Sequence, residues 1–209
     1  MKVWKFLQDD RRLGHGDGRL VKVGETLTVD GEIVLCRRGI HAARGAIDAL
    51  MYAPGSVAVR GEAGGMIAKG ADKLACAEFL PLAIVDAAET LRHFARLCAL
   101  DVAHLWHPAP DTVRFLHTGD PALRQAAHSN ASSAAAAEAA WAEAAWAAWT
   151  AAAAWAPAQA AWAAAAWAAK AQAAWAAKAT ARARAETKGK QARRLERMLQ
   201  QLIRKENAK

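Results

Sequence analysis

The sequence predicts an α+β protein in which a small, mostly antiparallel, β-rich head with helices is followed by a long helical tail rich in Ala and Trp. Three patterns predict this fold class. Residues 1–80 contain short apolar runs separated by Gly and Asp turns, as antiparallel strands do. From about residue 83 the apolar period changes from two residues to 3.6, which is typical of helices. Residues 131–177 include 31 alanines, and Ala has the highest helix propensity.

The 209 residues suffice for one ordinary domain with an appendage. Pro157 should break the Ala-rich tract because proline lacks the backbone N–H that a helix needs, and Gly189 should separate the tract from a last helix. The expected segments are an α+β head over 1–129 (strand-rich over 1–80, helical over 81–129), an Ala/Trp-rich helical tract over 130–188, and a basic amphipathic helix over 189–209.

Strands are predicted where apolar residues alternate between turn residues. Asp30-Gly31 is a hairpin signal because both residues tolerate the backbone of a tight two-residue turn. The predicted strands are Lys2–Leu7, Leu20–Val23, Thr26–Val29, Glu32–Cys36, Ser56–Glu62 and Lys73–Phe79. A short helix over Ala43–Tyr52 is predicted from apolar residues on one face, and Pro54-Gly55 should end it.

Helices are predicted in the second half of the head by apolar residues at helical spacing and by capping residues. The first helix should begin near Ala83 and end before His107. Its expected buried face is Ile84, Ala87, Leu91, Phe94, Ala95 and Cys98. Asp111 should cap a second helix, and Asp120-Pro121 should begin a third. Residues 129–133, rich in Ser and Asn, should mark the boundary before the Ala/Trp tract.

Seven tryptophans give the tract a large apolar surface: Trp141, Trp146, Trp149, Trp155, Trp162, Trp167 and Trp175. A lone helix of this kind exposes more apolar area than a soluble monomer tolerates, so we expect the tract to pack on a second copy, a partner protein or the head. Residues 144–169 carry no charge and are long enough to span a membrane. Ala is only weakly apolar, however, and polar residues interrupt the segment, so a membrane is the less favoured partner.

The net charge of +8 lies entirely in residues 178–209, which hold eleven Lys or Arg and three Glu. Two hypotheses explain this basic segment. The apolar residues Leu195, Met198, Leu199, Leu202 and Ile203 recur at helical spacing and predict an oligomerising or docking helix whose charges face solvent. Alternatively, the cations bind nucleic acid through its phosphates. The candidate contacts are Arg182, Arg184, Lys188, Lys190, Arg193, Arg194 and Arg197.

One compact cluster in the head, Cys36-Arg37-Arg38-Gly39-Ile40-His41, combines two guanidinium groups and an imidazole at a turn. Such a turn can bind an anion, because arginine donates paired hydrogen bonds to phosphate or carboxylate. His41 could act as an acid or base if a carboxylate such as Glu62 stood beside it. The alternative is a structural turn in which His41 is hydrogen-bonded and the arginines are solvated.

The sequence indicates no metal site and no cofactor. Cys36, Cys76 and Cys98 are far apart and form no CxxC pair or Cys/His cluster, so free thiols are expected. No phosphate-binding loop, GxSxG or GxGxxG pattern occurs. The N-terminal residues lack the apolar segment of a secretory signal.

The runs KVWKFL, LCRRGIHAARGAIDALMYAPGS and LRHFARLCALDVAHLW, with the Ala-rich tail, resemble an uncharacterised family of small bacteriophage and prophage proteins. The LCxxGxHA element is its most recognisable part. The resemblance covers most of the chain and implies a phage setting, in the host cytoplasm or the virion, without implying a chemistry.

A second resemblance is to ADP-ribosyltransferases, in which a Gly-Ile-Tyr-Phe run follows a strand that bears a His-Gly pair. Here Gly39-Ile40-His41 follows a strand, and a later strand ends in Gly61-Glu62. The chain departs from that pattern, since Trp4-Lys5 stands in place of His-Gly and His41 in place of Tyr. The resemblance implies that Glu62 would fill the acidic role in a reaction on NAD.

Together these patterns predict a non-enzymatic phage protein that binds or assembles through its C-terminal helices. Its partner would be a second copy or another phage or host protein. It would serve as a virion component or as an accessory protein that blocks a host factor. An NAD-dependent transferase and a nucleic-acid-binding protein are the alternatives.

Overall fold

The computed structural model describes residues 1–101, 103, 108–137 and 181–208, and they form an α+β fold with a mostly antiparallel sheet and helices. The chain divides into two compact units. The first unit comprises Met1–Ala88 and Leu195–Lys209, and the second comprises Glu89–Arg194. The division falls after Ala88 and after Arg194, so the C-terminal segment belongs to the same unit as the strands.

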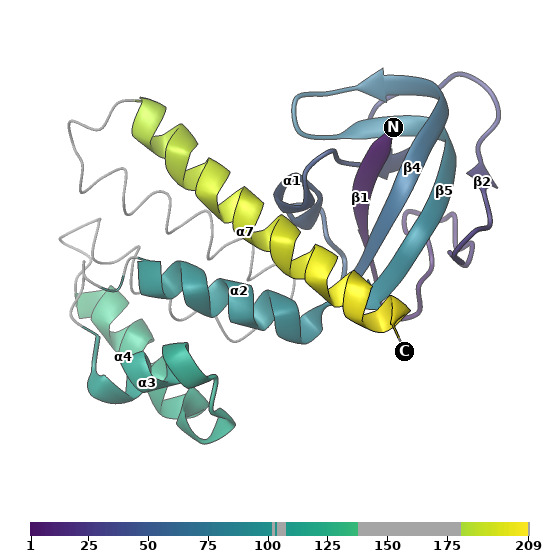
Figure 1. Ribbon diagram of the computed structural model, residues 1–209. Helices are drawn as coiled ribbons and strands as arrows, with labels where there is room; N and C mark the ends of the chain where they lie inside the picture. The colour runs from purple at the N-terminus through teal and green to yellow at the C-terminus, as the bar shows by residue number, and fades with distance from the viewer. Residues whose placement is uncertain (102, 104–107, 138–180, 209) are drawn as a thin grey trace. The chain divides into compact units, whose positions relative to one another are not determined.

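The first unit is built on a five-stranded antiparallel sheet. Its order is β1-β4-β5-β2, with β3 paired to β5, and Figure 1 shows the long β4–β5 hairpin with β1 beside β4. The strands are β1 (Lys2–Leu7), β2 (Leu27–Thr28), β3 (Ile40–Ala42), β4 (Val57–Lys69) and β5 (Leu74–Asp86). A short helix, α1 (Ala46–Leu50), connects β3 to β4.

Backbone hydrogen bonds between Trp4 and Ala43 bring the end of β3 back to β1. Trp4 N donates to Ala43 O at 2.7 Å, and Ala43 N donates to Trp4 O at 2.9 Å. The path β1-β4-β5-β3 therefore closes on itself. The buried core cluster draws on all four of these strands and on the loop after β1: Val3, Leu7, Leu13, Val21, Ile40, Ala42, Val57, Val59, Ala63, Leu74, Cys76 and Phe79.

Several predicted strands have different bounds in the structure. The prediction for Lys2–Leu7 is confirmed, whereas β4 and β5 extend well beyond the predicted Ser56–Glu62 and Lys73–Phe79 because the two strands pair along almost their whole length. Leu20–Val23 forms no strand, and of Thr26–Val29 only two residues pair. The prediction of a strand over Glu32–Cys36 is wrong. Residues 34–38 form a tight turn there, with Cys36 at a φ of +65°.

Gly55, two residues before β4, lies against the end of β1, and we expect Gly55→Ala to lower the free energy of unfolding by about 2 kcal/mol. An added Cβ would lie 2.7 Å from Leu7 O and 2.8 Å from Gln8 Cα. Both are backbone atoms, so relief requires the strand to shift. Urea unfolding measures the change. In the matched control Gly14→Ala, the added Cβ meets no atom within 4 Å. Equal midpoints for the two variants would contradict the prediction.

The second unit is helical, with α2 (Ala88–Asp101), α3 (Pro110–Thr118), a 3₁₀ turn η2 (Pro121–Leu123), α4 (Arg124–Ala137) and the first part of α7 (Ala181–Asn207). The expected buried face of α2 is confirmed at Leu91, Phe94, Ala95 and Cys98, which are fully buried. The predicted start near Ala83 is wrong, because β5 keeps pairing with β4 as far as Asp86. Asp86 then accepts a hydrogen bond from Ala88 N at 2.8 Å, which helps to start α2.

The ends of the helices in this unit show which of the predicted capping and breaking residues determine where a helix begins or ends. Asp120 Oδ1 accepts a hydrogen bond from Ala122 N at 2.9 Å, so the predicted start at Asp120-Pro121 is confirmed as a 3₁₀ turn. Asp111 lies in the first turn of α3 and is not its cap. Residues 129–133 do not end α4, and α7 continues through Gly189. A single glycine costs a helix only about 1 kcal/mol, which its helix-forming neighbours offset.

The C-terminal part of α7, from Leu195 on, belongs to the first unit and is partly buried. Leu195 and Leu199 are fully buried. Trp4 Nε1 donates to Glu196 Oε1 at 3.3 Å, which joins this helix to β1. The other apolar residues of the predicted stripe, Met198, Leu202 and Ile203, are half-buried. The chain itself therefore covers the centre of the stripe.

Candidate functional site

A cavity of about 660 Å³ opens in the first unit. Its lining comes from β1, from the loop at residues 13–17, from residues 36–43 and from Val29, Ala49, Tyr52 and Lys73. This volume lies within the range of small-molecule sites, about 300–1,000 Å³. The cavity is therefore the candidate functional site among the described residues.

The structure brings three of the four residues predicted for an anion site to this cavity. Arg37, Arg38 and His41 all line it. Glu62 does not, because it lies on β4 paired with Lys2 of β1 and Leu80 of β5. The structure therefore does not place Glu62 with His41 in the acid–base arrangement that the sequence suggested.

His41 is held as a neutral side chain that fixes the turn. Its Nε2 accepts a hydrogen bond from Cys36 N at 2.9 Å, so this nitrogen carries no proton. Burial lowers the pKa of His41, and the nearby Lys5 and Lys73 lower it further. The imidazole thereby anchors residue 36, the left-handed residue of the turn that carries Arg37 and Arg38.

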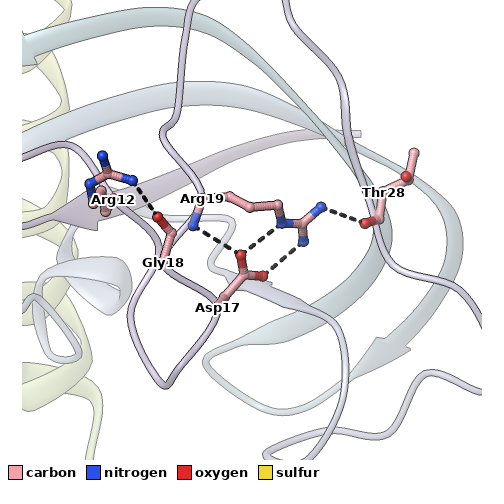
Figure 2. A network of polar contacts seen from close by, with 5 residues as sticks. All are labelled: Arg12, Asp17, Gly18, Arg19 and Thr28. Atoms are coloured by element: carbon pink, nitrogen blue, oxygen red, sulfur yellow. Dashed lines mark hydrogen bonds and ion pairs between the residues drawn. The ribbon is translucent and has the colours of Figure 1, made fainter.

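The loop that forms another wall of the cavity is fixed by an arginine–aspartate pair (Figure 2). Arg19 binds Asp17 through two bonds, Nε to Oδ1 at 2.7 Å and Nη2 to Oδ2 at 2.8 Å. Arg19 Nη1 also donates to Thr28 O at 2.8 Å, and Arg12 Nη1 donates to Gly18 O at 2.7 Å. The hydrogen bond from Arg19 holds the pKa of Asp17 below its usual range.

The lining is strongly cationic. Lys5, Arg37, Arg38 and Lys73 all contribute to it, and the one carboxylate among the residues placed around the cavity is Asp17. Because Arg19 already pairs with that carboxylate, the four cations leave the lining with a net positive charge. The site is therefore suited to an anion.

Lys5 is the cavity residue that the sequence analysis did not single out. The two-residue alternation of β1 places it on the same face as Val3 and Leu7, which belong to the core. Its Nζ donates to His41 O at 2.9 Å. Burial lowers the pKa of Lys5 to about 8, although Cys76 and Asp17 act in the opposite direction. The sequence signal for a buried lysine was its position in KVWKFL, where Lys5 lies between the apolar residues Val3 and Leu7 on one face of the predicted strand.

Tyr52, Asp72 and Lys73 form a small polar group near the turn. Tyr52 Oη donates to Asp72 Oδ2 at 2.7 Å, and Lys73 Nζ lies 4.3 Å from the centre of the Tyr52 ring. A hydrogen bond with Cys36 is the main cause that raises the pKa of Lys73. Lys73 therefore remains a charged group at the cavity.

The predicted contact residues of the tail differ in whether the structure describes them and in what they contact. Trp141, Trp146, Trp149, Trp155, Trp162, Trp167 and Trp175 lie outside the described residues. Arg182 and Arg184 are within α7, but their side chains are also outside what the structure describes. Arg194 binds Asp101 at 2.8 and 3.1 Å within the second unit, and Lys190 Nζ lies 3.9 Å from the same carboxylate. Lys188, Arg193 and Arg197 are exposed.

No family model, curated protein or solved structure matches this chain. Within the described ranges, no helix is long and apolar enough to cross a membrane. In the same ranges, His, Cys, Asp and Glu side chains form no group of three or more that could hold a metal ion.

Proposed function

We propose that the protein is a binding protein whose first unit holds a small phosphate- or carboxylate-bearing molecule in this cavity. The observation that carries the proposal is the composition of the lining, which holds four cationic side chains and one carboxylate, and that carboxylate is already paired with Arg19. A small anion entering the cavity would replace solvent around these cations with direct charged hydrogen bonds.

Arg37 and Arg38 are the residues best suited to contact the ligand. Both belong to the tight turn closed by hydrogen bonds between Val34 and Arg38, so their backbone positions are fixed before a ligand arrives. A guanidinium group can donate two parallel hydrogen bonds to a phosphate or carboxylate. Preorganisation of the turn lowers the entropy that binding would otherwise lose.

We expect the double variant Arg37→Ala/Arg38→Ala to bind inorganic pyrophosphate or citrate at least tenfold more weakly than the wild type. Loss of one charged hydrogen bond alone corresponds to about 1.5 kcal/mol, or roughly tenfold in affinity. Isothermal titration calorimetry at fixed ionic strength measures the change.

The matched control is Arg193→Ala/Arg197→Ala, which removes the same charge from two exposed positions on α7. It should leave the affinity within about twofold. Absence of binding to the wild type, or an equal loss in both double variants, would contradict the proposal and leave only a non-specific effect of net charge.

A further inference from the structure

We propose that Lys5 captures the carbonyl group of an anionic aldehyde or ketone in this cavity as a reversible imine. This inference rests on the proposed function and narrows its ligand class to small molecules that carry both a carbonyl and a phosphate or carboxylate. Imine formation requires a neutral amine, a cavity that admits the carbonyl, and a way to hold the rest of the molecule.

The placement of Lys5 meets the first two requirements. The residue lines the cavity while its strand face is otherwise apolar, so its amine is held in the wall and not on a solvated surface. The hydrogen bond to His41 O, a carbonyl of another lining residue, fixes the position of Nζ. In the described part of the chain, Lys5 forms no hydrogen bond or ion pair with a carboxylate, so no tight ion pair holds the amine in its charged form.

The protonation state of the amine supports the same step. With a pKa of about 8, roughly a tenth of the Lys5 amines are neutral at pH 7. An ordinary lysine has fewer than about one neutral amine in a thousand at that pH. Burial thus prepares Lys5 as a nucleophile before any ligand binds.

The surrounding cations meet the third requirement. Arg37, Arg38 and Lys73 line the same cavity and would bind the anionic end of the ligand. Binding at that end presents the carbonyl carbon to Lys5 as an intramolecular partner, which raises its effective concentration. A neutral aldehyde of similar size lacks this advantage.

The chemical step is a condensation without a redox change. The lone pair of the neutral Lys5 Nζ attacks the carbonyl carbon, and a C–N bond forms to give a carbinolamine. The carbonyl oxygen then leaves as water with the two hydrogens of the original amine, and a C=N bond remains. Addition of water reverses the sequence and returns the free lysine and the intact carbonyl compound.

Borohydride trapping tests the proposal on the full-length protein. Wild-type protein is incubated with glyoxylate at pH 7 and reduced with cyanoborohydride, and the adduct is located by peptide mass spectrometry. We expect Lys5 to be labelled at least tenfold faster than the exposed Lys2 on the same strand. Labelling of Lys2, Lys5 and the other lysines at equal rates would overturn the proposal.

Two variants test the roles of the arginines and of Lys5. Arg37→Ala/Arg38→Ala should slow labelling of Lys5 by glyoxylate at least tenfold but leave labelling by uncharged propionaldehyde within about twofold. Lys5→Arg keeps the charge and should abolish the adduct at that peptide. Because the peptide map of the wild type identifies the labelled residue by itself, the test does not depend on the folding of any variant.

The outcomes separate the two proposals. If pyrophosphate binds in an arginine-dependent way but Lys5 is not labelled preferentially, the imine is overturned and the anion-binding function stands. If Lys5 is labelled equally fast by glyoxylate and propionaldehyde, the anionic ligand class of the imine is overturned, whereas the proposed function is overturned only if pyrophosphate and citrate do not bind in an arginine-dependent way.

Discussion

Replacement of Lys5 by Met is expected to raise the free energy of unfolding by about 2 kcal/mol at pH 7. Burial lowers the pKa of Lys5 from 10.5 to about 8, and each unit corresponds to about 1.4 kcal/mol between the charged and neutral forms. The charged amine therefore destabilises the fold by about 3 kcal/mol. Loss of its hydrogen bond to His41 O offsets about 1 kcal/mol of the gain.

The effect has a defined pH dependence. The folded pKa of Lys5, about 8, lies below the value of 10.5 expected for the unfolded chain. Between these values the unfolded state binds more protons, so the stability of the wild type rises with pH over that interval. Below about pH 8 the penalty is present in full. The advantage of Lys5→Met should therefore be largest at pH 7 and shrink toward pH 10.

Urea unfolding of both proteins at pH 7 and pH 10 measures this difference. The control is Lys2→Met, an exposed lysine on the same strand, which should change the stability by less than about 0.5 kcal/mol at either pH. A Lys5→Met protein that is less stable than the wild type at pH 7, or whose advantage is the same at pH 10, would contradict the burial of the amine.

A destabilising lysine in the core face of β1 links stability to function in this molecule. An apolar residue at position 5 would complete the face shared by Val3 and Leu7. Strain or unfavourable burial of this kind concentrates at functional sites, where it prepares a group for binding or reaction. The same amine is the group that we propose reacts in the cavity.

The sequence predicted local features well where short-range patterns decide them. The bounds of β1, the buried face of α2 and the start at Asp120 follow from residues a few positions apart, and the structure has all three. The sequence also singled out Arg37, Arg38 and His41 from their clustering at one turn. All three line the cavity, although His41 is neutral and hydrogen-bonded.

The features that the sequence did not predict depend on pairing between residues that lie far apart in the chain. Gly61, Gly64 and Gly65 interrupt the apolar alternation of β4, yet the strand continues because β5 supplies hydrogen-bond partners along it. Trp4 and Ala43, which line the cavity, are joined by backbone hydrogen bonds although they lie far apart in the chain. A single-sequence pattern carries no record of such contacts, so the placement of Lys5 in one cavity with Arg37 and Arg38 emerged only with the fold.

The second large effect concerns the C-terminal helix. Leu199 is fully buried, and we expect Leu199→Ala to lower the free energy of unfolding of the full chain by about 2–5 kcal/mol. The loss combines the transfer of buried methyl groups to water with the cavity left behind. Thermal or urea unfolding measures it. Arg197→Ala, an exposed residue on the same helix, is the control and should change stability by less than about 0.5 kcal/mol.

The dependence on protein concentration shows what covers Leu199. Because Leu195 and Leu199 are buried by the chain itself, the midpoint of unfolding should not change with protein concentration in either the wild type or Leu199→Ala. If the apolar stripe instead joined two copies, the wild-type midpoint would rise with concentration, and Leu199→Ala would lower the mass measured by light scattering. That outcome would contradict docking within the chain and favour assembly through α7. A concentration-independent loss of stability would show that Leu199 is buried within the chain, on the same helix whose Glu196 accepts a hydrogen bond from Trp4 of β1.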